Sequence, residues 1–185
     1  MAKENTTYYI ILGLLTHEDM TGYDIKKRID YTISKFWDAG YWQIYPTLKV
    51  LEKDGFVTKA TAEKSKGPER VIFSITQRGK GKFLEWLSVP EQREYIKYEI
   101  LLKLFFGSLL PTDVNLKKIK EFQKEKQENL KEIEGFKESL EGVLSKSEDH
   151  LYYYLTVLFG EHIYKAYIAW ANEAEKLLKN RTVIE

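Results

Sequence analysis

One stretch, residues 40–76, constrains the fold of this chain more than any other. Its first part puts three apolar side chains on one helical face, at spacing i, i+4, i+7: Ile44, Leu48 and Leu51. Gly55 then provides a helix stop. Two runs rich in β-branched and aromatic residues follow, at 56–63 and 70–75, with a Gly-Pro turn and several cations between them. A helix followed by a basic two-stranded ribbon predicts a winged helix-turn-helix.

The polar side chains of this helix and hairpin are of the types that bind DNA. On the helix they are Gln43, Tyr45, Thr47 and Lys49. Glutamine can pair with adenine and threonine can contact a thymine methyl, whereas tyrosine and lysine suit phosphates. The hairpin tip adds Lys64, Lys66 and Arg70. A preceding helix start adds Thr21 and Tyr23, because a helix N-terminus attracts phosphate. Each group also has an ordinary alternative: the helix residues a solvated face, the hairpin residues an exposed tip, and Thr21 and Tyr23 a simple helix start.

The first half of the chain resembles the PadR transcriptional regulators in a set of motifs. They are Ile11-Leu12-Gly13-Leu14-Leu15, Thr21-Gly22-Tyr23-Asp24-Ile25, Gln43-Ile44-Tyr45-Pro46-x-Leu48-x-x-Leu51-Glu52-x-x-Gly55-x-Val57, Phe73-Ser74-Ile75-Thr76-x-x-Gly79 and Trp86. The second half is similar in length and helical pattern to the longer PadR subgroup, which is related to virulence activators and phenolic-acid-responsive repressors. The resemblance implies DNA binding and, as in some relatives, a response to small aromatic molecules.

Composition narrows the class of protein further. The 185 residues include no Cys, which excludes disulfides and thiolate chemistry and fits a cytoplasmic location. The longest apolar run, residues 8–15, is too short to cross a bilayer and is interpreted as a buried first helix. Residues 1–89 hold 14 Lys and Arg against 11 Asp and Glu, whereas residues 90–185 hold 15 against 17. The mild basic surplus therefore lies in the half that contains the predicted winged helix.

No pattern of catalytic or metal-binding residues stands out. The three histidines, His17, His150 and His162, are isolated, and no Gly-rich phosphate loop is present. We therefore expect neither an enzyme nor a metal or cofactor. One set of rings has two interpretations, as core and dimer packing or as the lining of a pocket for a small aromatic ligand. Its members are Trp37, Tyr41, Trp42, Tyr152, Tyr153, Tyr154, Tyr164, Tyr167 and Trp170.

The second half predicts three helices, at about 95–110, 116–144 and 150–178. The middle helix carries a narrow apolar stripe of the kind found in coiled-coil seams: Leu116, Ile119, Leu130, Ile133 and Leu140. Leu155 and Trp170 lie on the wide apolar arc of the last helix. A lone chain of this size would struggle to cover so much apolar surface, so we expect these residues to form a dimer interface.

The predicted fold class is therefore mainly α. It comprises an N-terminal winged helix-turn-helix with a two-stranded wing, residues 1–89, and a C-terminal helical dimerisation domain, residues 90–185. The expected function is sequence-specific binding of double-stranded DNA by a homodimeric repressor that reads an inverted repeat. The expected partners are DNA, a second copy of the chain and, as in some relatives, a small aromatic effector; no membrane is expected. The alternatives are a winged helix that binds protein and a small-molecule carrier in the helical half.

Overall fold

The computed structural model describes most of the chain. The described residues are 6–34, 37, 41–62, 70–90 and 97–181. The contacts between them divide the chain into two compact units, Met1–Arg93 and Glu94–Glu185. Among the described residues, no helix combines the length and the apolar character that crossing a membrane requires.

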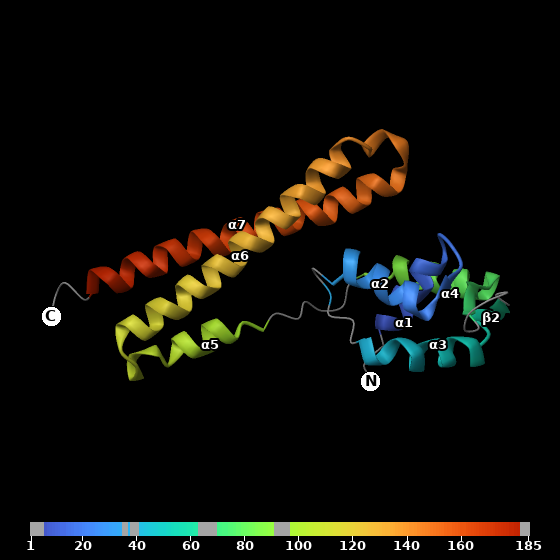
Figure 1. The fold of residues 1–185 in the computed structure, drawn as a ribbon, viewed down its shortest axis with the longest axis horizontal. Helices are drawn as coiled ribbons and strands as arrows, with labels where there is room; N and C mark the ends of the chain where they lie inside the picture. Colours follow the sequence, from blue (N-terminus) through green and yellow to red (C-terminus); the bar gives the residue numbers. More distant parts are fainter. Residues whose placement is uncertain (1–5, 35–36, 38–40, 63–69, 91–96, 182–185) are drawn as a thin grey trace. The chain divides into compact units, whose positions relative to one another are not determined.

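The first unit is a set of helices with a small sheet (Figure 1). Its elements are α1 (Thr6–Leu15), β1 (Met20–Thr21), α2 (Gly22–Thr32), the 3-10 turn η1 (Tyr41–Gln43), α3 (Ile44–Lys53), β2 (Val57–Ala62), β3 (Arg70–Ile75) and α4 (Gln77–Ser88). The sheet is antiparallel with the order β1-β3-β2, and Val57 pairs with Ile75 at the base of the β2–β3 hairpin. This confirms the predicted winged helix-turn-helix.

The predicted helix boundaries rest on local hydrogen bonds. Thr21 caps α2 in a reciprocal capping box with Asp24, and Thr76 caps α4 by accepting from the backbone N–H of Gly79 at 3.0 Å. Gly55 follows α3 with φ of 72°, a left-handed conformation that favours glycine. The predicted helix start at Thr21 and the predicted stop at Gly55 are thus confirmed. α2 ends at Thr32.

Pro46 lies near the start of α3. A 3-10 turn over Tyr41–Gln43 leads into the helix, which becomes α-helical at Ile44. Pro46 thus lies in the first turn of α3, where a backbone N–H has no partner within the helix. The proline therefore costs α3 no hydrogen bond.

The core of the first unit is formed by its first three helices and the sheet. The side chains with almost no exposed surface are Ile11, Leu12, Ile25, Ile29, Ile44, Leu48, Leu51 and Val57. Tyr9 of α1 stacks on Trp86 of α4, with ring centroids 4.7 Å apart. β1, which the pattern did not predict, joins this core because Met20 is buried and pairs with Phe73.

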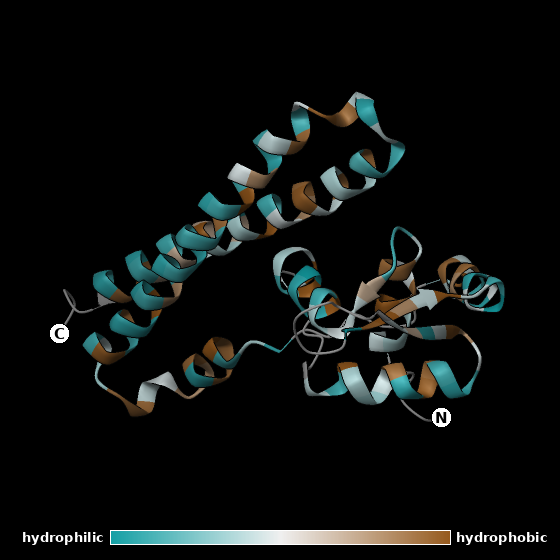
Figure 2. Ribbon diagram, turned by 45° about the vertical axis from the view of Figure 1, so that its right-hand side comes forward, coloured by the Kyte–Doolittle hydropathy of each residue, from teal (hydrophilic) through white to brown (hydrophobic). Residues whose placement is uncertain are grey.

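The second unit is wholly helical in its described part. It comprises α5 (Glu99–Phe105), the 3-10 turn η2 (Gly107–Leu109), α6 (Thr112–Glu141), the 3-10 turn η3 (Leu144–Lys146) and α7 (Glu148–Arg181). α6 and α7 lie side by side as an antiparallel pair (Figure 1). α5 is shorter than the predicted helix at 95–110. In Figure 2 most of α5 and the turn after it are coloured as hydrophobic.

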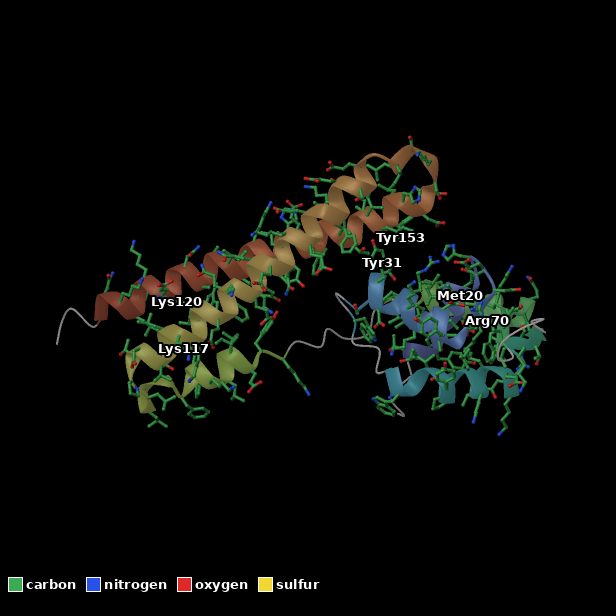
Figure 3. The ribbon with its side chains drawn as sticks, viewed as in Figure 1. Met20, Tyr31, Arg70, Lys117, Lys120 and Tyr153 are labelled. Atoms are coloured by element: carbon green, nitrogen blue, oxygen red, sulfur yellow. The ribbon has the colours of Figure 1, made fainter. Side chains whose placement is uncertain are left out.

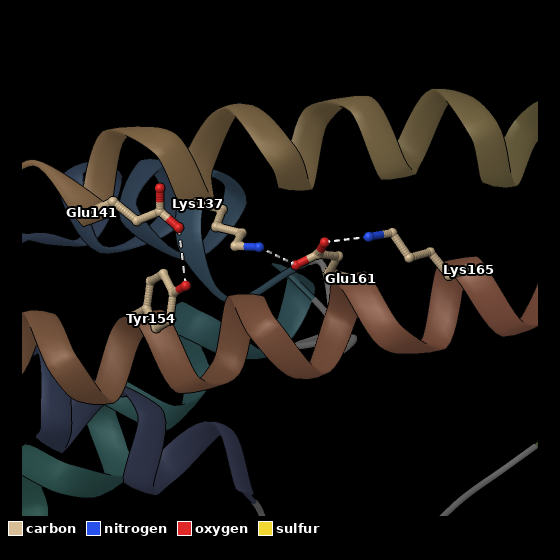
Figure 4. Close-up of polar contacts among 5 residues, drawn as sticks. All are labelled: Lys137, Glu141, Tyr154, Glu161 and Lys165. Carbon is tan, nitrogen blue, oxygen red and sulfur yellow. Dashed lines mark hydrogen bonds and ion pairs between the residues drawn. The ribbon is translucent and has the colours of Figure 1, made fainter.

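Ile119 and Ile133 of α6 are buried within this single unit, and Ile133 contacts Gly160 of α7. A polar network also joins the two helices (Figure 4). Glu161 of α7 is only 7% exposed and accepts from Lys137 of α6 at 2.8 Å and from Lys165 one turn along α7. These two hydrogen bonds lower the pKa of Glu161 to about 2.

Candidate nucleic-acid interface

A surface groove of about 530 Å³ lies between the start of α2, the outer face of α3 and the sheet. The lining includes five residues that the sequence picked out as DNA-binding candidates from three separate segments: Thr21, Tyr23, Tyr45, Lys49 and Arg70. The fold thus brings together side chains that lie up to 49 positions apart in the sequence. Lys64 and Lys66 fall outside the described residues.

The outer face of α3 carries Tyr45, which is 57% exposed, and Lys49 one turn later. Lys53 continues the same face, and Trp42 projects into solvent just before the helix. The sequence analysis did not single out Lys53. Its spacing of four from Lys49 is the signal that would have found it, since residues four apart lie on one helical face.

Two of the predicted base-reading residues lie elsewhere. Thr47 is only 3% exposed, so the prediction that it faces outward is wrong. The reason is spacing, because Thr47 follows Ile44 by three positions and shares its inward face. Gln43 lies in the turn before α3, and its side-chain oxygen accepts from the Thr7 hydroxyl of α1 at 3.4 Å. Its amide is therefore partly committed to holding α3 against α1.

At the start of α2, the polar groups of Thr21 and Asp24 hydrogen-bond to each other. The Thr21 hydroxyl donates to the Asp24 carboxylate at 2.7 Å and accepts from the Asp24 backbone N–H at 3.1 Å. The bond from the Thr21 hydroxyl is the main cause that lowers the pKa of Asp24, and Arg70 and Lys27 add to it. Thr21 is therefore a structural cap first, whereas Tyr23 beside it is well exposed.

The charges of the groove sum to a positive value. Lys59 pairs with Glu52 at 2.9 Å, and Asp24 is held by Thr21. Within the part of the chain that the structure describes, neither Lys49 nor Arg70 forms an ion pair. Lys49 and Arg70 can therefore meet an anion at the groove, as phosphate binding requires, although the ionised Asp24 offsets part of the charge of Arg70.

Comparison with known proteins identifies the chain. Residues 11–85 match the model of the transcriptional regulator PadR-like family, and residues 96–179 match the model named virulence activator alpha C-term. The negative transcriptional regulator PadR of Bacillus subtilis is 31% identical over 169 residues, which cover 88% of this chain and 91% of that protein. The chain belongs to the PadR family. Like the rest of the family it is a DNA-binding regulator of transcription with a winged helix.

Solved structures of a PadR protein match over nearly the whole length. Bacillus subtilis PadR in complex with operator DNA superposes with a TM-score of 0.81 at 28% identity, and the match covers 92% of this chain and 98% of that one. The same Bacillus subtilis protein in complex with p-coumaric acid gives a TM-score of 0.76 at 28% identity, and covers 92% and 97%. The PadR family is one of transcriptional regulators rather than enzymes.

The residues predicted for dimer contact divide into two groups in this PadR-family chain. Ile119 and Ile133 are buried between α6 and α7 of the same chain, and the remaining stripe residues, Leu116, Leu130 and Leu140, are half-buried. Trp170 packs edge-on against Phe122 of α6, with ring centroids 5.6 Å apart. Leu155 keeps about half of its surface exposed. Ile119 and Ile133 of the stripe thus pack within the pair formed by α6 and α7 of one chain, and the dimer contact of the other residues stays a prediction.

Part of the predicted ring set forms a cluster inside the second unit. The hydroxyls of Tyr98 and Tyr167 are 2.6 Å apart, and the Tyr167 ring also meets those of Phe122 and Tyr164. Burial and the bond to Tyr98 raise the pKa of Tyr167. Trp42 and Tyr152 stand exposed instead. Within the described residues, no group of three or more His, Asp and Glu side chains is arranged to hold a metal ion.

Proposed function

We propose that this chain is a cytoplasmic homodimeric repressor that binds an inverted-repeat operator through the groove between α2, α3 and the sheet. The observation that carries this proposal is the convergence of Tyr23, Tyr45, Lys49 and Arg70 on that one groove. Phenol hydroxyls and cationic side chains are the groups that position a protein on the phosphate backbone.

The dimer is supported by the apolar surface of the second unit. Phe105 and Leu109 are 82% and 80% exposed, and Leu102 and Phe106 beside them are also exposed. Exposed apolar patches of this density mark protein interfaces. A second copy of the chain is the simplest partner, because a two-fold dimer presents two reading units to half-sites about one helical turn apart.

Repression and release by an effector are supported by the relatives. Bacillus subtilis PadR is a negative regulator, and its structures include one with operator DNA and one with p-coumaric acid. The ring cluster around Tyr98, Phe122 and Tyr167 gives this chain aromatic surface of a kind that binds planar acids.

The decisive experiment selects bound DNA from a random pool and titrates the winning sequence by mobility shift. We expect an inverted repeat bound by two protomers. A winning sequence without two-fold symmetry, or no selected sequence at all, would contradict the proposal and leave the protein-binding winged helix. Addition of p-coumaric acid to the shifted complex then tests the effector, with release of the DNA as the expected result.

Matched charge variants test the groove. Arg70→Ala should weaken binding to operator and scrambled DNA alike and reduce the slope of log affinity against log salt by about 1 per lost phosphate contact. Lys117→Ala on α6, labelled with Arg70 in Figure 3, removes an exposed cation outside the groove and should change neither quantity. Equal effects of the two variants would mean that the groove has no special role.

A further inference from the structure

Gly22, the first residue of α2, lies close to the ring of Tyr45 from α3. A β-carbon built on Gly22 would stand 2.6 Å from Cε1 of Tyr45 and 3.1 Å from its Cζ. The first distance is shorter than a real β-carbon contact allows, and the second is tighter than most such contacts. The edge of the tyrosine ring therefore occupies the space that any other residue at position 22 would fill.

Glycine is needed at position 22 because a side chain there would collide with Tyr45, and not because of the backbone conformation. Among the described glycines, Gly55 alone has a positive φ, so the backbone at Gly22 accepts an alanine without strain. The three atoms nearest to the missing β-carbon all belong to the Tyr45 ring. Gly79 is the opposite case, because its β-carbon would stand 2.2 Å from the carbonyl oxygen of Phe56, which cannot move without the backbone.

The contact restrains a side chain that would otherwise be mobile. Tyr45 is more than half exposed, and a surface tyrosine loses rotamer freedom when it binds a ligand. Seated against the first turn of α2, its ring is held in place before any ligand arrives. Lys49 lies one turn further along α3 on the wall of the same groove, and Arg70 lies on the sheet side.

We propose that Gly22 is a positioning residue for DNA binding, because its bare backbone seats the Tyr45 ring and so holds the Tyr45 hydroxyl ready to donate to a DNA phosphate. The inference deepens the proposed function and rests on it. A phenol carries no charge, so this contact contributes affinity without releasing a counterion. Tyr45 and Gly22 thus differ from Lys49 and Arg70 in the salt dependence that they impart.

The test compares Gly22→Ala, Tyr45→Ala and the double variant in the full-length chain on the selected operator. Gly22→Ala should keep the melting temperature, since a surface ring yields easily, and should weaken binding by about tenfold, the value of a hydrogen bond to a charged group. The slope of log affinity against log salt should stay at the wild-type value. In the Tyr45→Ala background, Gly22→Ala should have no further effect, because no ring is left to displace.

A matched control and a spectroscopic readout complete the design. Gly81→Ala makes the same change in α4, where a β-carbon meets nothing within 4 Å, and should leave DNA binding unchanged. Incorporation of 3-fluorotyrosine, with the Tyr45 signal assigned by Tyr45→Phe, reports the ring directly. That ¹⁹F signal should move toward the value of a solvent-exposed tyrosine in Gly22→Ala and stay in place in Gly81→Ala.

The results distinguish a failure of the proposed function from a failure of the proposed role of Gly22. A wild-type chain that binds no selected DNA would overturn the proposed function. Wild-type binding with Gly22→Ala indistinguishable from Gly81→Ala would overturn the role of Gly22 alone. Additive effects of the Gly22 and Tyr45 substitutions, an unmoved ¹⁹F signal, or a Gly22→Ala chain that fails to fold would each overturn it as well.

Discussion

The two units differ in how completely they bury their apolar side chains. Among the largest fully buried side chains of the described residues, Ile119 alone belongs to the second unit. The first unit closes a core around Ile11, Leu48 and Leu51, whereas the second is essentially a pair of long helices with apolar residues left outside. Two helices can cover one face of each other and no more. We therefore expect the first unit to fold alone and the second unit to be covered by a partner surface.

Separating the units should have the largest effect. A chain cut after Pro90 keeps the core and the groove, so it should fold and be monomeric. Its operator affinity should fall by roughly 10²- to 10⁴-fold, because the second half-site no longer binds intramolecularly. Light scattering and a mobility shift on the same truncated protein measure both properties. A truncated chain that still dimerises would show that the first unit also carries an interface.

A core substitution in the first unit should come next. Leu12→Ala removes a side chain with no exposed surface and should cost about 2–5 kcal/mol of unfolding free energy. Because that core lies within one chain, the loss should not depend on protein concentration. Urea unfolding at two concentrations provides the check, and a concentration-dependent loss would mean that the first unit relies on a partner as well.

Charges on the exposed apolar surface should act on assembly instead of folding. Phe105→Glu combined with Leu109→Glu should leave helix content unchanged but weaken the dimer by about 2 kcal/mol or more, as substitutions at the centre of an interface do. Sedimentation over a concentration series measures this. The matched control is Leu84→Glu, an exposed apolar residue on α4 of the first unit, which should leave the dimer intact. If Leu84→Glu dissociates it equally, the interface extends beyond α5 and η2.

The smallest effect should be the pH dependence of the helical pair. Glu161 has a folded pKa of about 2, below the usual 4.5, so its contribution to stability is present above about pH 4.5 and is lost as the pH falls toward 2. Protonation of Glu161 would leave Lys137 and Lys165 without their shared carboxylate. Glu161→Gln should flatten this acid dependence in urea unfolding at pH 7 and pH 3. Glu128→Gln, exposed on α6, should not.

Local signals of the sequence predicted the fold because they depend on nearby residues. The capping box of Thr21 and Asp24, the cap at Thr76 and the stop at Gly55 all form within a few positions along the chain. β1 was missed because two residues are too few for a period, and Met20 is a strand residue only through its pairing with Phe73. Tertiary pairing of that kind leaves no local pattern.

The site was predicted less completely, for two physical reasons. The polar side chain of Thr47 and its absence from the set Ile44, Leu48 and Leu51 predicted an outward position, but Thr47 lies on the same side of α3 as Ile44. An apolar stripe also shows that a face is covered without showing by which chain. Ile133 is covered by α7 of its own chain, whereas Leu155 leaves half of its surface uncovered. The contact between Gly22 and Tyr45 had no sequence signal, since 23 positions separate the two residues.

The packing around Phe56 connects α3, β2 and α4 rigidly. The Phe56 carbonyl accepts from the backbone N–H of Thr76 at 3.0 Å and lies against Gly79, while Arg78 covers the Phe56 ring. Phe56 thus packs tightly against the end of α3, the start of β2 and the start of α4. Packed junctions of this kind shift as bodies rather than bend. In the proposed dimer, the proposed effector would therefore change the distance between the two DNA-binding units and leave the internal structure of each unit unchanged.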